Sequence, residues 1–198
     1  MTRKTAVGIA LGFATSLAWN PALAHTYGAH GAGLTAGFMH PVMGLDHVLA
    51  MVAVGLWAAQ RGGADLWRLP AAFIGATVLG MLVALAGIGL PMVELGIAGS
   101  VVLLGIFVGL AARIPSPAAM ALVALFALFH GYAHGAELPE TAVPVLYALG
   151  FVAATALLHG IGVGTGLLAK RFGARAAARA LRASGILVAL AGAFLAAA

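Results

Sequence analysis

Six apolar stretches follow one another along this chain, each close to the roughly 20 residues that a helix needs to cross a bilayer. Only 8% of the 198 residues are charged, whereas a soluble domain carries about 25%. The 28 glycines suit close helix packing in lipid. We therefore expect an all-α membrane protein, a six-transmembrane-helix bundle, with spans at about 41–60, 69–88, 91–112, 116–135, 143–166 and 180–197.

The first 24 residues have the pattern of an N-terminal secretory signal peptide. Arg3 and Lys4 give a positive start, residues 6–18 are apolar, and Ala22-Leu23-Ala24 is a small-residue cleavage site. An uncleaved first membrane helix is the alternative interpretation of residues 1–24.

Cleavage after Ala24 leaves residues 25–198 as the transmembrane domain and His25 as the new N-terminus. The free amine and the imidazole of His25 could then chelate a divalent metal, although a terminal histidine is more often incidental. The chain has no cysteine, which excludes disulfides and thiolate metal sites.

The basic residues predict the orientation of the bundle. The net charge is +5, yet outside the leader every Lys and Arg lies between two spans or around their ends, which argues against nucleic-acid binding. The positive-inside rule places these segments in the cytoplasm and the mature N-terminus outside, in the periplasm. They comprise Arg61 and Arg68, then Arg113, then Lys170, Arg171, Arg175, Arg179 and Arg182.

A first cluster of ionisable residues, His40, Asp46 and His47, opens the first span. An Asp at the middle of a spanning helix costs about 2.5–3.5 kcal/mol, so some compensating partner is expected. On one straight helix Asp46 would point about 120° away from His40. Pro41 and Gly44 favour a non-helical start, with the regular helix beginning near Leu45.

A second cluster, His130, His134 and Glu137, closes the fourth span. Spacings of four and three residues place all three side chains on one helix face. A histidine pair four residues apart is a common metal-ligand spacing, and helices in bundles build metal sites from Glu and His.

Depth in the bilayer connects these clusters with a lone acid, Glu94, in the first turn of the third span. The topology places both clusters and Glu94 in the outer part of the membrane, with His130 about one turn deeper. His159, in the fifth span, lies deeper again. Glu94 could instead be a solvated charge at a helix N-terminus, and His159 a buried histidine bonded to a carbonyl.

Imidazole and carboxylate ligands suit Ni, Co, Zn, Cu(II) and Fe(II), and the donors alone do not choose among them. A Cu(I) site of Met and His is an alternative, although the methionines are better explained by packing. An intramembrane metal-dependent hydrolase and a haem-binding membrane protein are further alternatives. Ser100 lies in the third span, outside any G-x-S-x-G context, and no P-loop is present.

Two segments resemble the signature of the HupE/UreJ family of nickel/cobalt permeases. They are His40-Pro41-x-x-Gly44-x-Asp46-His47 with the apolar run that follows, and Phe129-His130-Gly131-x-x-His134-Gly135-x-Glu137. The resemblance implies functional roles for His40, Asp46, Glu94, His134 and Glu137, and less securely for His47, His130 and Phe73. Phe73 is expected near the cytoplasmic end of the second span, where it could only pack or gate.

The resemblance also implies import of Ni²⁺ or Co²⁺ across a bacterial inner membrane, supplying a metalloenzyme. The protein is then a multi-pass permease and not an enzyme. It has no permanently bound cofactor, because the metal is its cargo, and its partners are the lipid bilayer and the divalent ion. A homo-oligomer is a further expectation. Metals other than nickel and cobalt are compatible with the same ligands.

Overall fold

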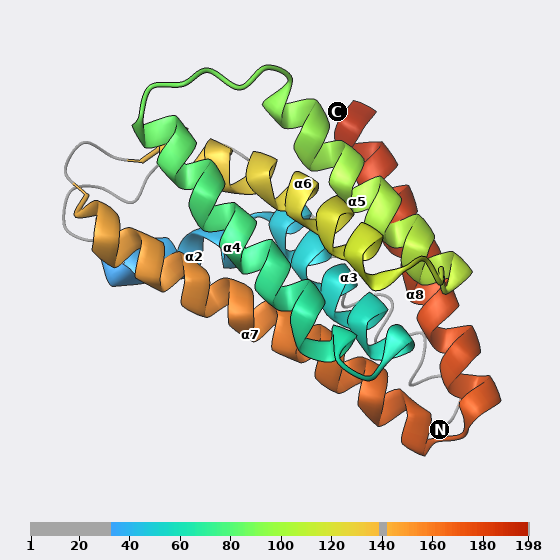
Figure 1. Cartoon of the computed structure of the whole chain (residues 1–198). Coiled ribbons are helices and arrows are strands. Elements are labelled where there is room, and N and C mark those ends of the chain that lie inside the picture. The colour runs from blue at the N-terminus through green and yellow to red at the C-terminus, as the bar shows by residue number, and fades with distance from the viewer. Residues whose placement is uncertain (1–32, 139–141, 198) are drawn as a thin grey trace, which may run out of the picture.

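The computed structural model describes residues 33–138 and 142–197, and this part of the chain is helical without a β-strand. The predicted signal peptide and His25 lie outside the described residues. Figure 1 shows the helices as one elongated bundle. They are α2 (Leu34–Met43), α3 (Leu45–Arg61), α4 (Asp65–Leu85), α5 (Val93–Leu110), α6 (Ser116–Ala136), α7 (Pro144–Arg171) and α8 (Ala174–Ala197).

Five helices, α4 to α8, are long and apolar enough to cross a membrane. Helices α2 and α3 pass the same test as a pair, bent by 83° at the break between them. The described part of the chain is thus all-α and multi-pass, with five candidate spans, or six when the bent pair is counted as one. This confirms the all-α, multi-span part of the predicted fold class.

The bend lies at Gly44, whose backbone is extended. The prediction that the regular helix begins near Leu45 is confirmed, but the prediction of a non-helical start through Pro41 is wrong. Pro41 lies inside α2. Packing of α2 against α7 explains why the proline is tolerated: a Cβ on Gly37 would collide with the backbone of Tyr147. Tertiary contact thus overrides the local preference of proline.

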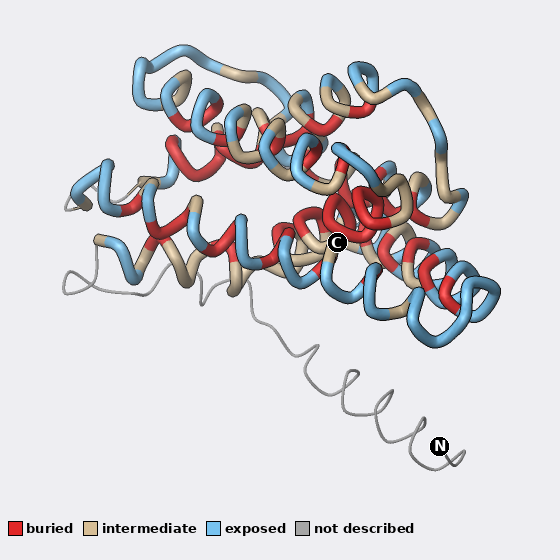
Figure 2. The backbone as a smooth tube through the Cα atoms, turned by 60° about the horizontal axis from the view of Figure 1, so that its bottom comes forward, coloured by how far each residue is buried: buried red, intermediate tan, exposed pale blue. Residues whose placement is uncertain are grey.

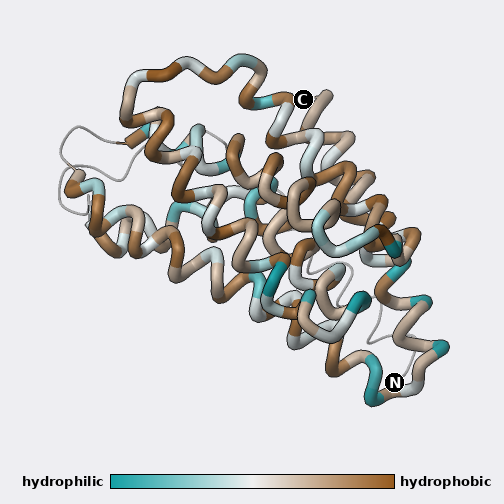
Figure 3. The backbone as a smooth tube through the Cα atoms, in the orientation of Figure 1, coloured by the Kyte–Doolittle hydropathy of each residue, from teal (hydrophilic) through white to brown (hydrophobic). Residues whose placement is uncertain are grey.

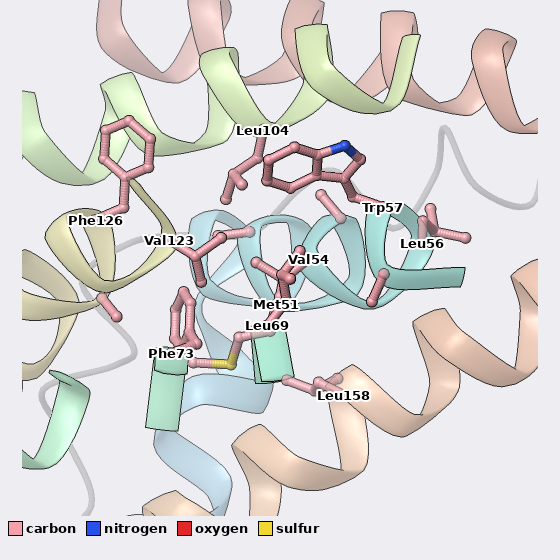
Figure 4. Close-up of a cluster of buried hydrophobic side chains, with 14 of the residues drawn as sticks. Met51, Val54, Leu56, Trp57, Leu69, Phe73, Leu104, Val123, Phe126 and Leu158 are labelled. Atoms are coloured by element: carbon pink, nitrogen blue, oxygen red, sulfur yellow. The ribbon is translucent and has the colours of Figure 1, made fainter. Parts of the chain in front are cut away.

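Helix α3 forms the centre of the bundle. Figure 2 shows buried residues on the inward faces of the helices and exposed residues outside. Met51, Val54 and Trp57 of α3 are fully buried and belong to the main apolar core. In Figure 4 Met51 lies beside Phe73 and Leu69 of α4, which supports the packing role predicted for this methionine.

The outward faces of the helices are apolar, as a lipid environment requires. Large side chains such as Leu110, Leu187 and Phe194 are exposed there. Most of the strongly hydrophilic segments in Figure 3 gather toward one end of the bundle. This basic end holds the last residues of α3, α5 and α7 and the first residues of α4, α6 and α8.

Several helices begin or end beyond the predicted spans, so some basic residues are helical instead of lying in connections. Arg68 lies in the first turn of α4, which begins at Asp65. Lys170 and Arg171 form the last turn of α7. Arg175, Arg179 and Arg182 lie in α8, which begins at Ala174. Membrane helices commonly continue into the polar interface, where long basic side chains reach water.

A buried ion pair ties the helices together at the basic end. Arg61 Nε donates to Asp65 Oδ2 at 2.7 Å, and the two side chains are only 8% and 9% exposed. Ser116 Oγ also donates to Asp65 Oδ2, at 3.0 Å. The Arg61 guanidinium lies 5.3 Å from the ring centroid of Trp57. These contacts join α3, α4 and α6.

Close backbone contact defines four helix pairs. In each pair a glycine on one helix faces the backbone of its partner, where an added Cβ would have no space. The four contacts are Gly37 and Gly150 between α2 and α7, Gly55 and Gly162 between α3 and α7, Gly80 and Gly131 between α4 and α6, and Gly105 and Gly185 between α5 and α8. Small residues at such positions are typical of helix association in lipid.

Replacing Gly131 with Ala is expected to force α4 and α6 apart. The added methyl would collide with the Thr77 carbonyl oxygen, which belongs to backbone and cannot turn away. We expect a loss of about 1–3 kcal/mol in unfolding free energy, measured by thermal or denaturant unfolding in detergent. Gly75→Ala in α4 is the matched control, because a Cβ there meets nothing within 4 Å. Equal stability of the two variants would contradict the prediction.

Candidate metal site

Four histidine rings from three helices pack together at the end of the bundle opposite the basic end. His40 comes from the last turn of α2, His47 from the first turns of α3, and His130 and His134 from the last turns of α6. The ring centroids of His47 and His134 are 4.4 Å apart, those of His40 and His134 4.5 Å, and those of His47 and His130 4.7 Å. We call these four side chains the histidine cluster.

Two carboxylates join the histidine cluster. Asp46 Oδ1 lies 2.7 Å from His47 Nδ1 and also accepts a hydrogen bond from the His47 backbone N–H at 2.8 Å. Glu137 Oε2 lies 3.9 Å from His40 Nε2. The structure therefore brings together six of the residues that the sequence singled out, from both predicted clusters.

The bend at Gly44 makes the Asp46–His47 pair sterically possible. A Cβ at position 44 would lie 2.8 Å from His47 Nδ1 and 2.9 Å from Asp46 Oδ1. The bend at Gly44 also directs α2 back across the start of α3. The ring centroids of His40 and His47 are therefore 6.5 Å apart. Asp46 thus reaches the cluster through His47.

The partner of His47 determines which ring nitrogen can bind a cation. An ionised carboxylate can only accept hydrogen bonds, so the Nδ1 that faces Asp46 carries the proton. Nε2 is then the nitrogen with a free lone pair. It is buried and has no hydrogen-bond partner in the described part of the chain. A carboxylate behind a histidine is the usual support for a metal-binding imidazole.

Ser100 of α5 fixes the orientation of His130 by the same logic. The Ser100 hydroxyl donates to the Ile97 carbonyl at 2.6 Å, so it accepts from His130 Nε2, which lies at 2.8 Å. The remaining nitrogen, His130 Nδ1, holds the lone pair and is buried without a hydrogen-bond partner among the described residues. Sequence reasoning missed this role because it tested Ser100 only as a nucleophile.

His134 contacts the rings of both His40 and His47. It is 1% exposed, and neither ring nitrogen has a hydrogen-bond partner in the described ranges. Aromatic rings of α7 close the site: Phe151 lies 4.2 Å from the His134 ring centroid and Tyr147 lies 6.1 Å from that of His40. Neither contact could be predicted from residue spacing, because each joins residues in different spans.

The structure does not bring Glu94 into the cluster. Glu94 is exposed in the first turn of α5, and no contact between it and the cluster histidines is found among the described residues. Its position at the same end of the bundle agrees with the predicted depth. The alternative of a solvated acid near a helix N-terminus describes its environment well.

Phe73 is closer to the site than the sequence predicted. Its ring centroid lies 5.7 Å from that of His130 and 5.0 Å from that of His159. The expectation that Phe73 lies far from the site is wrong because α4 begins at Asp65, which places Phe73 two turns inside the helix. His159 contacts Phe73 and lies outside the histidine cluster.

Unpaired buried polar atoms are costly, at about 1–3 kcal/mol each. Four ring nitrogens in the cluster are of this kind within the described residues. Among the described residues, no group of three His, Asp or Glu side chains is already arranged to hold one metal ion. The rings pack face to edge, at angles up to 89°. Coordination of a cation would require them to turn, as interface side chains commonly do on binding.

The fold and the site define a class: a multi-pass helical membrane protein with buried imidazoles and partly exposed carboxylates near one end. Residues 13–195 match the family model described as HupE / UreJ protein. The chain is 47% identical over 176 residues to Protein HupE of Rhizobium leguminosarum bv. viciae, covering 88% of this chain and 91% of that protein. The chain therefore belongs to the HupE/UreJ family. No solved structure gives a significant match.

Proposed function

We propose that this protein is a secondary permease that imports a divalent transition metal, Ni²⁺ or Co²⁺, across a bacterial inner membrane. The histidine cluster with Asp46 and Glu137 would be the binding site for the cargo. The resemblance of its two motifs to nickel/cobalt permeases directs the proposal to these metals. Metalloenzyme maturation is the expected use of the imported ion.

One observation carries the proposal: four imidazoles, three of them buried, and two carboxylates meet near one end of a helical bundle whose outward faces are apolar. Asp46 accepts from His47 Nδ1, and Ser100 accepts from His130 Nε2. The lone pairs on His47 Nε2 and His130 Nδ1 therefore remain available to a cation. Ionisable groups at membrane depth generally mark ion or substrate pathways. Neutral imidazole and carboxylate are the donors that borderline divalent metals prefer.

The charge distribution supports entry from the end that holds the cluster. All Lys and Arg of the described residues lie at or near the basic end, which the positive-inside rule assigns to the cytoplasm. The cluster end would then face the periplasm, together with the mature N-terminus. Glu94, exposed at that end, can attract a cation before it reaches the histidines.

The geometry of Ser100 does not favour hydrolysis through a serine nucleophile. Its hydroxyl proton is directed to the Ile97 carbonyl, and Ser100 and His130 are both fully buried. A nucleophile must instead be accessible to substrate and activated by a base. We expect a purified sample to show no haem Soret band and no hydrolytic activity.

Metal uptake by cells that express the chain tests the proposal. Radiolabelled Ni²⁺ and Co²⁺ should enter by a saturable process that is absent from cells without the protein. Unlabelled Cu²⁺ and Zn²⁺ should compete less well than unlabelled Ni²⁺ and Co²⁺. Uptake no greater than the background for all four metals would reject transport, and preferential Cu²⁺ or Zn²⁺ uptake would reject the proposed cargo.

Uptake is expected to fall as the external pH decreases from neutral toward about 6, near the ordinary pKa of a histidine side chain. Metal binding requires neutral imidazole and ionised carboxylate, so protons compete with the cation. The measurement is the initial uptake rate against external pH at a fixed free metal concentration. A rate that stays constant from neutral to mildly acidic medium would argue against histidine ligation.

A further inference from the structure

His159 is a buried histidine that the cluster does not include. It lies near the middle of α7, is 1% exposed, and has neither ring nitrogen hydrogen-bonded in the part of the chain that the structure describes. The carbonyl partner that the sequence offered as a simple explanation is therefore not found. A neutral imidazole at this depth keeps both a donor and an acceptor without compensation.

A second unpaired polar group accompanies His159 on the same helix face. Thr155, one turn before it, is 1% exposed, and its hydroxyl has no hydrogen-bond partner within the described ranges. Residues spaced by four share one face, so Phe151, Thr155 and His159 form a stripe along α7. Phe151 contacts His134 of the cluster. His159, eight residues further, lies about 12 Å deeper along the helix axis.

Phe73 connects His159 with the cluster. Its fully buried ring contacts both His130 and His159, with centroid distances of 5.7 and 5.0 Å. A cation that leaves His130 for the cytoplasm along this line meets the phenyl ring first and His159 next. The phenyl ring offers the cation no lone pair to replace its lost ligands.

We propose that His159, with the hydroxyl of Thr155, forms a second and transient binding station for the transported divalent cation. In this arrangement Phe73 is the apolar barrier between the two stations. The proposal rests on the proposed permease function and deepens it. One imidazole and one hydroxyl bind a borderline metal more weakly than the cluster does, which suits an intermediate stop that the ion must leave.

The test uses the full chain reconstituted in liposomes, with Ni²⁺ as the probe. His159→Phe removes both ring nitrogens and keeps an aromatic side chain. We expect the maximal uptake rate to fall about tenfold or more, while the KM for Ni²⁺ and equilibrium binding at the cluster stay within about threefold. Leu157→Phe is the matched control, because Leu157 is 51% exposed on the outward face. It should transport like the wild-type protein.

A cysteine variant provides a readout that does not depend on transport. The natural chain has no cysteine, so His159→Cys introduces a single thiol. If the position lies on the ion route, a small cationic thiol reagent added from the cluster end should modify it, and Ni²⁺ should slow the reaction. Phe73→Ala in the same background should speed modification by removing the barrier.

The outcomes separate this inference from the permease proposal. Ni²⁺ transport by His159→Phe at the wild-type rate would overturn the second station alone. Thiol modification of His159→Cys that Ni²⁺ does not slow would do the same. A wild-type protein that neither binds nor transports Ni²⁺ or Co²⁺ would instead reject the permease function. Should His159→Phe fail to fold, His159→Asn keeps a smaller polar side chain and is subject to the same expected loss of rate.

Discussion

Asp46→Asn is expected to reduce Ni²⁺ uptake by about 10–100-fold while the protein still inserts and folds. The substitution is nearly isosteric, but it removes the negative charge that holds the proton on His47 Nδ1. His47 Nε2 then loses its fixed orientation and part of its basicity toward the cargo. The measurement is the initial uptake rate, normalised to the amount of protein in the membrane.

A double-mutant cycle shows whether Asp46 acts through His47. If it does, Asp46→Asn adds little to the loss already caused by His47→Ala, because the two residues form one unit. His40→Ala and Glu137→Gln, on the other side of the cluster, should each abolish uptake. Wild-type rates in Asp46→Asn, or fully additive losses in the cycle, would contradict the arrangement proposed for this pair.

Asp65→Asn is expected to cost about 3–5 kcal/mol of unfolding free energy, the largest stability change predicted for this protein. Asp65 and Arg61 form a buried pair, and the amide would leave the guanidinium without a compensating charge. Removing one partner of a buried pair is much more damaging than removing both. Thermal unfolding of the purified variants in detergent measures the change.

The matched comparison is the double variant Arg61→Met/Asp65→Leu. Apolar residues of similar volume fill the same space without buried charge, so we expect most of the lost stability to return. A double variant that is less stable than Asp65→Asn alone would show that the pair contributes more than the avoidance of an isolated charge. Unchanged stability of Asp65→Asn would show that water reaches Arg61.

The common depth of the two histidine motifs could be predicted from sequence, because topology alone places the start of the first span and the end of the fourth at the same membrane face. The orientation of each ring could not. Ser100 reaches His130 from another helix, and residue spacing carries no signal for a contact across 30 positions. Phe73 was misplaced because the start of α4 was predicted four residues late, at a polar boundary where hydropathy changes gradually.

The helical conformation of residues around Pro41 also escaped prediction, since a proline and a nearby glycine usually end regular structure. The contact of Gly37 with α7 stabilises the helical conformation around Pro41, and this contact depends on the whole fold. The Arg61–Asp65 ion pair also escaped prediction, because Arg61 ends α3 and Asp65 begins α4, so their approach depends on the turn between two helices.

The glycine contacts between helices have a mechanical consequence. Where the backbones of two helices touch, the helices cannot slide or separate without losing their packing. Each such helix pair therefore moves as one rigid unit. His40 and His47 belong to the unit formed by α2, α3 and α7, and His130 and His134 to the unit formed by α4 and α6. The histidine cluster thus bridges two stiff units. A small rotation of one unit against the other changes the distances between ligands while leaving each unit intact.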